Sequence, residues 1–309
     1  MVNRSFAIRD DAVYLVVEDT LKSLQYLAAW YRKQFKTPVI AVTGTNGKTS
    51  TKEMLYQIVS MQYLTEKTPG NFNNHIGLPL SLLRWTKHLE VGILEMGTNH
   101  FGDIDMLCKI AHPTHGVITN IGEGHLEFLK DKAGVARAKG ELLDHLTENG
   151  TAFLNGDDPY LLSMQKKVKE TILFGFSEQC HVRGIDLVSD TNSVSFSVED
   201  QPIQLHCPGE HNAYNALAAI SVAKALNVSW QNIQDGLARF QPVDQRFQQI
   251  KIKGVTFFND AYNANPGSLE SGIRTLASMK ISGRKILVMG DMLELGMKSK
   301  QAHVKMGAF

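Results

Sequence analysis

The segment "TGTNGKTST", residues 43–51, restricts what this chain can fold into more than any other stretch. It follows the apolar run "VIAV" and precedes a helical pattern, so it predicts a strand, a glycine loop and a helix in succession. In that setting the main-chain N–H groups of the loop and of the helix N-terminus converge on anionic oxygens. The segment therefore predicts a phosphate-binding loop at the end of a strand.

The loop is two residues shorter than the common G-x-x-x-x-G-K-[ST] form, because only Thr45 and Asn46 separate its two glycines. Lys48 is expected to reach the β- and γ-phosphates of a nucleotide, and the Thr49 hydroxyl to bind Mg²⁺. The alternative is a glycine-rich turn followed by a surface lysine, which the strand, loop and helix context disfavours. The predicted nucleotide-binding set in the loop comprises Gly44, Thr45, Asn46, Gly47, Lys48, Thr49 and Ser50.

Strand and helix patterns alternate after this loop. The apolar runs "VGILEMG", "HGVITNIG" and "TAFLNG" are separated by helical patterns at 102–111 and 131–147. This rhythm predicts an α/β fold with a P-loop NTPase-like, mostly parallel central sheet and flanking helices. Ligands of such sheets bind at the carboxyl ends of the strands. Short alternating strands between about 171 and 207 predict an antiparallel edge, and helical patterns return at 211–226 and 230–239.

Three parts are predicted along the chain: residues 1–36, residues 37–243 and residues 244–309. The first contains a helical pattern at 20–35, and the second contains the phosphate loop. The third follows the junction "FQPVDQR" and has a strand, helix and strand pattern that ends with "KILVMGD", the start of a second, Rossmann-like α/β domain. One such unit cannot cover both faces of a sheet, so this domain is expected to be incomplete.

The charge, the cysteine content and the lengths of the apolar runs indicate which kinds of partner and which cellular compartment to expect. The 32 basic and 31 acidic side chains are interspersed and give a net charge of +1, which disfavours binding to nucleic acid or an anionic membrane. The three cysteines form no C-x-x-C motif, as expected in a reducing cytoplasm. No apolar run reaches the roughly 18–20 residues that span a bilayer, and the first residues lack the apolar segment of a signal peptide. We expect a cytoplasmic, monomeric protein with small-molecule partners.

Three further residues are candidates for metal chemistry. Glu95 ends the strand pattern "GILEMG" and His125 follows another strand in "ITNIGEGHLE", so both could reach the cleft near the loop. Either could instead be structural, as a helix cap or a hydrogen-bonded histidine, and imidazole is an unusual ligand for Mg²⁺. Lys139 in "ARAKGELL" has the pattern of a solvated helix lysine. If it were buried beside metal ions, its amine could lose its proton and react with CO₂ to form a carbamate.

Seven motifs together resemble those of the Mur ligases, ATP-dependent amide-forming enzymes of peptidoglycan synthesis. They are "TGTNGKTST", "TPGNFNNHIGLPLSLL", "LEMGTNHFGDIDML", "ITNIGEGHLEF", "ARAKGELL", "GEHNAYNALAA" and "NDAYNANPGSLE…VMGDMLELG". The resemblance runs from about residue 13 to the end of the chain and is closest to the branch that adds D-alanyl-D-alanine. The short loop is similar to the one that Mur ligases and folylpolyglutamate synthetases share.

The resemblance implies roles for the matching residues. ATP phosphates would be held by Lys48 and the loop amides, one Mg²⁺ by Thr49 and Glu95, and a second by His125 and carbamylated Lys139. Further nucleotide contacts would come from His211, Asn212 and Asn215 at the adenine, Arg246 near the phosphates and Asp260 at the ribose. Asn71 and Asn74 are expected to line the cleft.

The resemblance also implies a reaction. A carboxylate of UDP-N-acetylmuramoyl-tripeptide would be activated by ATP as an acyl phosphate and joined to D-alanyl-D-alanine. Residues 1–36 would be a remnant of a UDP-sugar-binding domain, and a chain lacking parts at both ends is expected to have little activity. Two alternatives stay open. One is a related amide ligase, such as a UDP-muramoyl-tripeptide synthetase or a folylpolyglutamate synthetase-like enzyme, and the other is a non-catalytic nucleotide-binding remnant.

Overall fold

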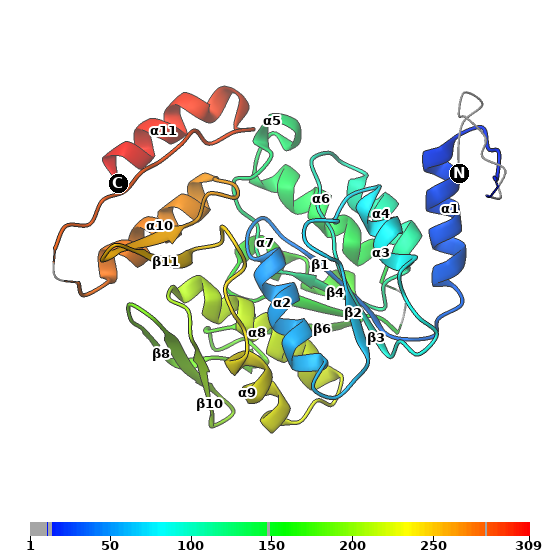
Figure 1. Cartoon of the computed structure of the whole chain (residues 1–309), viewed down its shortest axis with the longest axis horizontal. Coiled ribbons are helices and arrows are strands. Elements are labelled where there is room, and N and C mark those ends of the chain that lie inside the picture. The colour runs from blue at the N-terminus through cyan, green and yellow to red at the C-terminus, as the bar shows by residue number, and fades with distance from the viewer. Residues whose placement is uncertain (1–10, 12–13, 147–148, 282) are drawn as a thin grey trace.

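A parallel sheet of seven strands forms the centre of the molecule (Figure 1). The computed structural model describes residue 11 and residues 14–146, 149–281 and 283–309. Every neighbouring pair of strands in this sheet is parallel, which confirms the predicted sheet. Its order is β2 (Thr65–Lys67), β3 (Val91–Glu95), β1 (Val39–Thr43), β4 (His115–Ile118), β5 (Thr151–Asn155), β6 (Glu170–Gly175) and β7 (Val182–Arg183).

Helices cover both faces of this sheet, because its central strands are apolar on both sides. Along β1, Val39 and Ala41 pack into one hydrophobic core, while Ile40 and Val42 pack into the other. The first core is covered by α1 (Thr20–Arg32), α3 (Gly77–Leu82), α4 (Asp103–Ala111), α5 (Leu126–Leu129), α6 (Lys132–Asp144) and α7 (Pro159–Ser163), with η1 (Gln165–Lys167) after α7. The second is covered by α2 (Lys48–Val59), α8 (Glu210–Ala225) and α9 (Trp230–Ala238).

A separate antiparallel sheet corrects one expectation. Its three strands are β8 (Ile185–Ser189), β9 (Val194–Val198) and β10 (Gln201–Leu205), in the order β10-β9-β8. We expected these strands as an edge of the central sheet, but that edge is formed by β6 and β7, which are parallel to the rest. Alternate residues of β9 are buried against the α8 and α9 side, as suits a sheet with one covered face.

The C-terminal segment, residues 245–309, lies beside the carboxyl ends of the central strands (Figure 1). It consists of the antiparallel hairpin β11 (Gln248–Ile252) and β12 (Val255–Asn259), then α10 (Pro266–Ser278), η2 (Gly296–Lys298) and α11 (Ser299–Ala308). The predicted strand "KILVMGD" is wrong. Residues 285–291 are irregular, and Val288 is 90% exposed. A strand requires a neighbour to accept its main-chain hydrogen bonds, and none of the described strands pairs with this run.

Candidate active site

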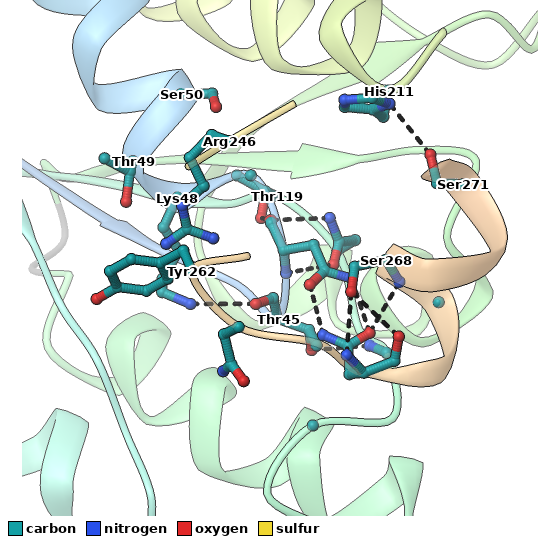
Figure 2. A pocket seen from close by; sticks show the side chains of 18 of the residues that line it. Thr45, Lys48, Thr49, Ser50, Thr119, His211, Arg246, Tyr262, Ser268 and Ser271 are labelled. Carbon is teal, nitrogen blue, oxygen red and sulfur yellow. Dashed lines mark hydrogen bonds between the residues drawn. The ribbon is translucent and has the colours of Figure 1, made fainter. Parts of the chain in front are cut away.

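A cleft of about 600 Å³ separates the carboxyl ends of the central strands from the C-terminal segment. Figure 2 shows the side chains around it, with Lys48 and Thr49 from α2 near Arg246 and Tyr262 of the C-terminal segment. Its position matches the expectation that ligands of a parallel sheet bind outside the carboxyl ends of the strands. All the predicted loop residues from Thr45 to Ser50 line it.

The phosphate loop fits its surroundings so closely that its two glycines cannot be replaced without movement. A Cβ on Gly44 would lie 1.8 Å from Thr119 Oγ1, and one on Gly47 would lie 2.2 Å from Asn215 Oδ1. Both glycines also have positive φ, 146° and 81°. The loop is held in place by Thr119, whose hydroxyl donates to the Asn46 carbonyl at 2.6 Å. The loop is therefore preorganised by β4 and α8.

The N-terminus of α2 supplies free hydrogen-bond donors to the cleft. Within the described chain, the main-chain amides of Lys48, Thr49 and Ser50 have no main-chain partner, as is usual for the first turn of a helix. The Lys48 ammonium donates to the carbonyls of Gly44 and Thr45, at 2.9 and 3.1 Å. Burial lowers the pKa of Lys48, and the positive charge of Arg246 lowers it further, although the charge of Glu95 opposes this. These donors form a site suited to phosphate oxygens.

Glu95 ends β3, and one of its carboxylate oxygens makes no hydrogen bond. Its side chain is buried, and Oε1 accepts a hydrogen bond from Asn73 Nδ2 at 2.8 Å. Oε2 is buried and has no hydrogen-bond partner. This oxygen lies 3.5 Å from the Lys52 ammonium, so its charge is partly offset while its lone pairs remain free for a divalent cation. Mg²⁺ typically takes one or two protein oxygens and completes its shell with phosphate and water. The cleft, with Thr49 and Glu95 in its lining, fits that requirement.

His125 lies at the other side of the cleft with a left-handed backbone, φ 54°. Its Nδ1 is 2.5 Å from Glu294 Oε2 of the C-terminal segment, and the Glu127 amide donates to the Glu294 carbonyl. Burial lowers the pKa of His125, the nearby carboxylate of Glu294 opposes that shift, and the charges of Lys139 and Lys48 add to it. The imidazole therefore lies close enough to both lysines for their charges to lower its pKa.

Lys139 is only 1% exposed, on α6. Within the described part of the chain its ammonium has no hydrogen-bond or ion-pair partner. Burial lowers its pKa well below the usual value, and the charge of Lys48 lowers it further. A lowered pKa increases the share of the neutral amine, which is the form that reacts with CO₂. It is not among the residues that line the cleft.

The residues predicted to contact the adenine lie together at the start of α8. His211, Asn212 and Asn215 all line the cleft. Burial lowers the pKa of His211 to about 4, so this ring is neutral at neutral pH, and its Nδ1 is 3.1 Å from Ser271 Oγ of α10. Asn215 Oδ1 accepts from Thr51 Oγ1 at 3.3 Å, which ties α8 to α2.

Arg246 and Asp260 reach the cleft from the C-terminal segment. The Arg246 guanidinium lies 3.8 Å from the centre of the Tyr262 ring, in a cation–π contact. Asp260 Oδ1 accepts from the Phe247 amide at 3.0 Å. Burial raises the pKa of Asp260, and the hydrogen bond from Phe247 and the charge of Arg246 oppose that shift. The structure thus places an arginine on the phosphate side of the cleft and a carboxylate next to it.

The C-terminal segment touches the phosphate loop directly. Asn265 Nδ2 donates to Asn46 Oδ1 at 2.6 Å, and Asn46 Nδ2 donates back to Asn265 Oδ1 at 3.3 Å. Asn265 also caps α10, because its Oδ1 accepts from the Ser268 amide. This reciprocal amide pair joins residues that are 219 positions apart.

One expectation about the cleft is wrong, and several contacts were not predicted. We expected Asn71 and Asn74 to line the cleft, but Asn73 does so and binds Glu95. Asn74 instead accepts from two amides at the start of α3, and Asn71 donates to Tyr262 at 3.4 Å. The segment "GNFNN" signals a turn, but an irregular turn has no periodicity to show which asparagine faces inward. Glu294 and Thr119 were also missed.

Two absences bear on the class of site. Among the described residues, no group of three or more His, Cys, Asp or Glu side chains could hold a metal ion without other ligands. A metal in the cleft would therefore need hydroxyl, carbamate or phosphate oxygens as well. Over the same residues, no helix has the length and apolar character needed to cross a bilayer.

The fold and the cleft define an α/β protein with a phosphate loop at the end of β1 and a C-terminal segment that packs against that loop. Residues 42–223 match the Mur ligase middle domain, and residues 245–309 match the Mur ligase, glutamate ligase domain. The chain belongs to the Mur ligase family.

Individual relatives agree with this assignment. The chain is 37% identical over 295 residues to UDP-N-acetylmuramoyl-tripeptide–D-alanyl-D-alanine ligase of Bacillus subtilis, covering 95% of this chain and 65% of that enzyme. A crystal structure of MurF from Acinetobacter baumannii superposes with a TM-score of 0.90 at 36% identity, covering 98% and 67% of the two chains. MurF ligase from Thermotoga maritima, solved with ADP, gives a TM-score of 0.86 at 33% identity, covering 98% and 71%. The chain thus spans about two thirds of these relatives.

Proposed function

We propose that this protein uses ATP to join D-alanyl-D-alanine to UDP-N-acetylmuramoyl-tripeptide in peptidoglycan synthesis. The observation that carries the proposal is the Glu95 oxygen that makes no hydrogen bond, which shares one cleft with the free amides of α2 and with Lys48. The names of the relatives support the choice of both substrates. The protein would act in the cytoplasm as a monomer, with no nucleic acid or membrane partner. The three-part division at residues 36 and 243 stays a prediction.

The residues of this chain would act on the nucleotide first. Lys48 would exchange its contacts with the Gly44 and Thr45 carbonyls for phosphate oxygens, beside the α2 amides. His211, Asn212 and Asn215 would hold the adenine, and Asp260 the ribose. Arg246 would add a second positive charge near the phosphates. Mg²⁺ held by Thr49 and Glu95 would neutralise phosphate charge.

The substrate carboxylate would then attack the γ-phosphate to give an acyl phosphate. Activation is needed because a bare carboxylate is a poor electrophile, and the dipeptide amine would attack the activated carbonyl with loss of phosphate. Lys48 and Arg246 would stabilise the charge that develops on the transferred phosphoryl group. The C-terminal segment would exclude water from the cleft through its contacts at Asn46 and His125.

We further propose that Lys139 becomes carbamylated and serves a second Mg²⁺ together with His125. Its burial, its lack of a partner and its lowered pKa support this role. The carbamate would convert a buried cation into an anion with two acceptor oxygens. A mass increase of about 44 Da at Lys139 in native mass spectrometry, abolished in Lys139→Met, is the expected signature.

The test of the main proposal is phosphate release from Mg-ATP in the presence of UDP-muramoyl tripeptide, with D-alanyl-D-alanine added or withheld. Release that depends on the dipeptide is the expected result, and Lys48→Met should abolish it. Release that depends instead on diaminopimelate, lysine or glutamate would identify a related amide ligase. Nucleotide binding without release under any of these conditions would contradict the proposal and favour a nucleotide-binding remnant.

A further inference from the structure

Lys52 is a buried lysine that the reaction outlined above does not use. It lies on α2 one turn after Lys48, and its side chain is fully buried. Its ammonium donates to the main-chain carbonyls of Thr68 and Gly70, each at 3.0 Å. These two carbonyls begin the segment that carries Asn73 to Glu95. Lys52 thus joins the helix of the phosphate loop to the wall of the cleft.

Two carboxylates also face this ammonium. Glu53 Oε1 is 3.3 Å away and Glu95 Oε2 is 3.5 Å away. Glu53 is in turn paired with Lys67, a lysine on β2 that also lies over the Tyr56 ring. Two cations and two carboxylates therefore form a neutral cluster. Within it, Lys67 contacts Glu53, whereas Lys52 alone is paired with Glu95.

The Lys52 ammonium places a positive charge beside Glu95 without forming a hydrogen bond to the lone pairs of Oε2. Glu95 Oε2 makes no hydrogen bond, although the ammonium is near, because two of the three N–H donors of Lys52 are directed to the Thr68 and Gly70 carbonyls and Glu53 Oε1 lies nearer than Glu95 Oε2. A cation at this distance offsets much of the cost of burying a carboxylate. The free lone pairs of Oε2 remain available to another ligand.

We propose that Lys52 is the resident counterion of Glu95: its charge offsets the cost of burying this carboxylate and weakens the affinity of the carboxylate for a divalent cation. This inference rests on the proposed function only in taking Glu95 as a metal ligand. The weakening follows from repulsion, since the bound metal and the ammonium would share one carboxylate in a poorly solvated site. The site would then release its metal more easily than an isolated buried glutamate.

The experiment is a titration of the whole chain with Mn²⁺ in saturating ADP, with free Mn²⁺ measured by electron paramagnetic resonance and corrected for Mn²⁺ held by ADP alone. Lys52→Met should bind Mn²⁺ about tenfold more tightly than the unchanged protein, because a repelling charge is removed. Lys52→Arg, which keeps the charge, should bind with nearly unchanged affinity. Lys67→Met is the matched control, and its affinity should change by less than about threefold because Lys67 is paired with Glu53 only.

A purely structural role would give the opposite sign. If Lys52 only secured the segment at Thr68, its loss would disorder the site and weaken Mn²⁺ binding, which would overturn the proposal. An equal rise in Mn²⁺ affinity in Lys67→Met would also overturn it, because the effect would then come from the net charge of the cluster and not from the contact between Lys52 and Glu95. Lys52→Gln keeps a donor for the loop carbonyls, should bind Mn²⁺ more tightly as well, and replaces Lys52→Met if that variant does not fold.

This titration separates the present inference from the proposed function. It contains neither the muramoyl substrate nor the dipeptide, so its outcome does not depend on which amine is ligated. If the unchanged protein and both neutral variants bind no Mn²⁺ beyond that held by ADP, the counterion proposal fails. The assay of dipeptide-dependent phosphate release decides the reaction independently.

Discussion

The substitution Gly44→Ala tests how firmly the phosphate loop is built into the fold. Its new Cβ would lie 1.8 Å from Thr119 Oγ1, so Thr119 must move and its 2.6 Å hydrogen bond to the Asn46 carbonyl is lost. Losing that bond costs about 0.5–1.5 kcal/mol. The backbone at φ 146° adds about 1–3 kcal/mol for a residue other than glycine. We expect the free energy of unfolding to fall by about 2–4 kcal/mol in total.

The assay is urea denaturation monitored by circular dichroism, with ADP affinity measured on the same samples. Gly70→Ala is the matched control, because Gly70 also has a positive φ, 50°, but a Cβ there would meet no atom within 4 Å. It should cost only about 1 kcal/mol. In the double variant Gly44→Ala with Thr119→Ala, the clash with the hydroxyl is removed. The stability loss of the double variant should therefore be smaller than the sum of the losses of the two single variants. If Gly44→Ala costs no more than Gly70→Ala, the argument from close packing is wrong.

Three other predictions concern charged or titratable groups. Lys48→Met should lower ADP affinity by at least about tenfold while the urea midpoint stays within error, because its ammonium contacts only carbonyls of its own loop; unchanged affinity in a binding titration would contradict this. The lowered pKa of Lys139 means that the unfolded chain binds more protons than the folded one between the two pKa values, so stability should rise with pH toward about 10. Lys139→Met should reduce that rise in urea titrations at successive pH values, leaving the part that Lys48 contributes through its own lowered pKa, and an unchanged rise would refute the assignment. The pKa of His211, about 4, predicts that stability is lost as pH falls from about 6.5 to 4, by about 3 kcal/mol. His211→Gln should flatten that loss, and an identical pH profile would show that the ring is not buried in solution.

The phosphate loop and the parallel sheet could be predicted because they depend on local patterns. An apolar run, two glycines and a helical period recur within about 20 residues around Lys48, and each signal agrees with the others. The positions of Glu95 and His125 followed from the rule that ligands gather at the carboxyl ends of parallel strands. The structure places both in the cleft lining. What the residues bind there remains a proposal.

The rest depended on partners that are distant in the sequence. The run "KILVMGD" has the composition of a buried strand, but a strand also requires a neighbour, which composition does not encode. The same holds for Glu294, which meets His125 across 169 positions, and for Lys139, whose burial depends on the packing of α6 rather than on its neighbours in sequence. Asn73 was missed because an irregular turn has no period that distinguishes its inward side.

The amide pair between Asn46 and Asn265 makes the cleft a shared property of two distant stretches of chain. A ligand that touches both the phosphate loop and the C-terminal segment binds well only when the two are docked. Docking therefore raises the affinity for the ligand by some factor, and the bound ligand raises the docking equilibrium by the same factor. This reciprocity follows from thermodynamics and requires no change of shape within either part. A nucleotide held by both parts would therefore have an affinity that includes the free energy of docking the C-terminal segment.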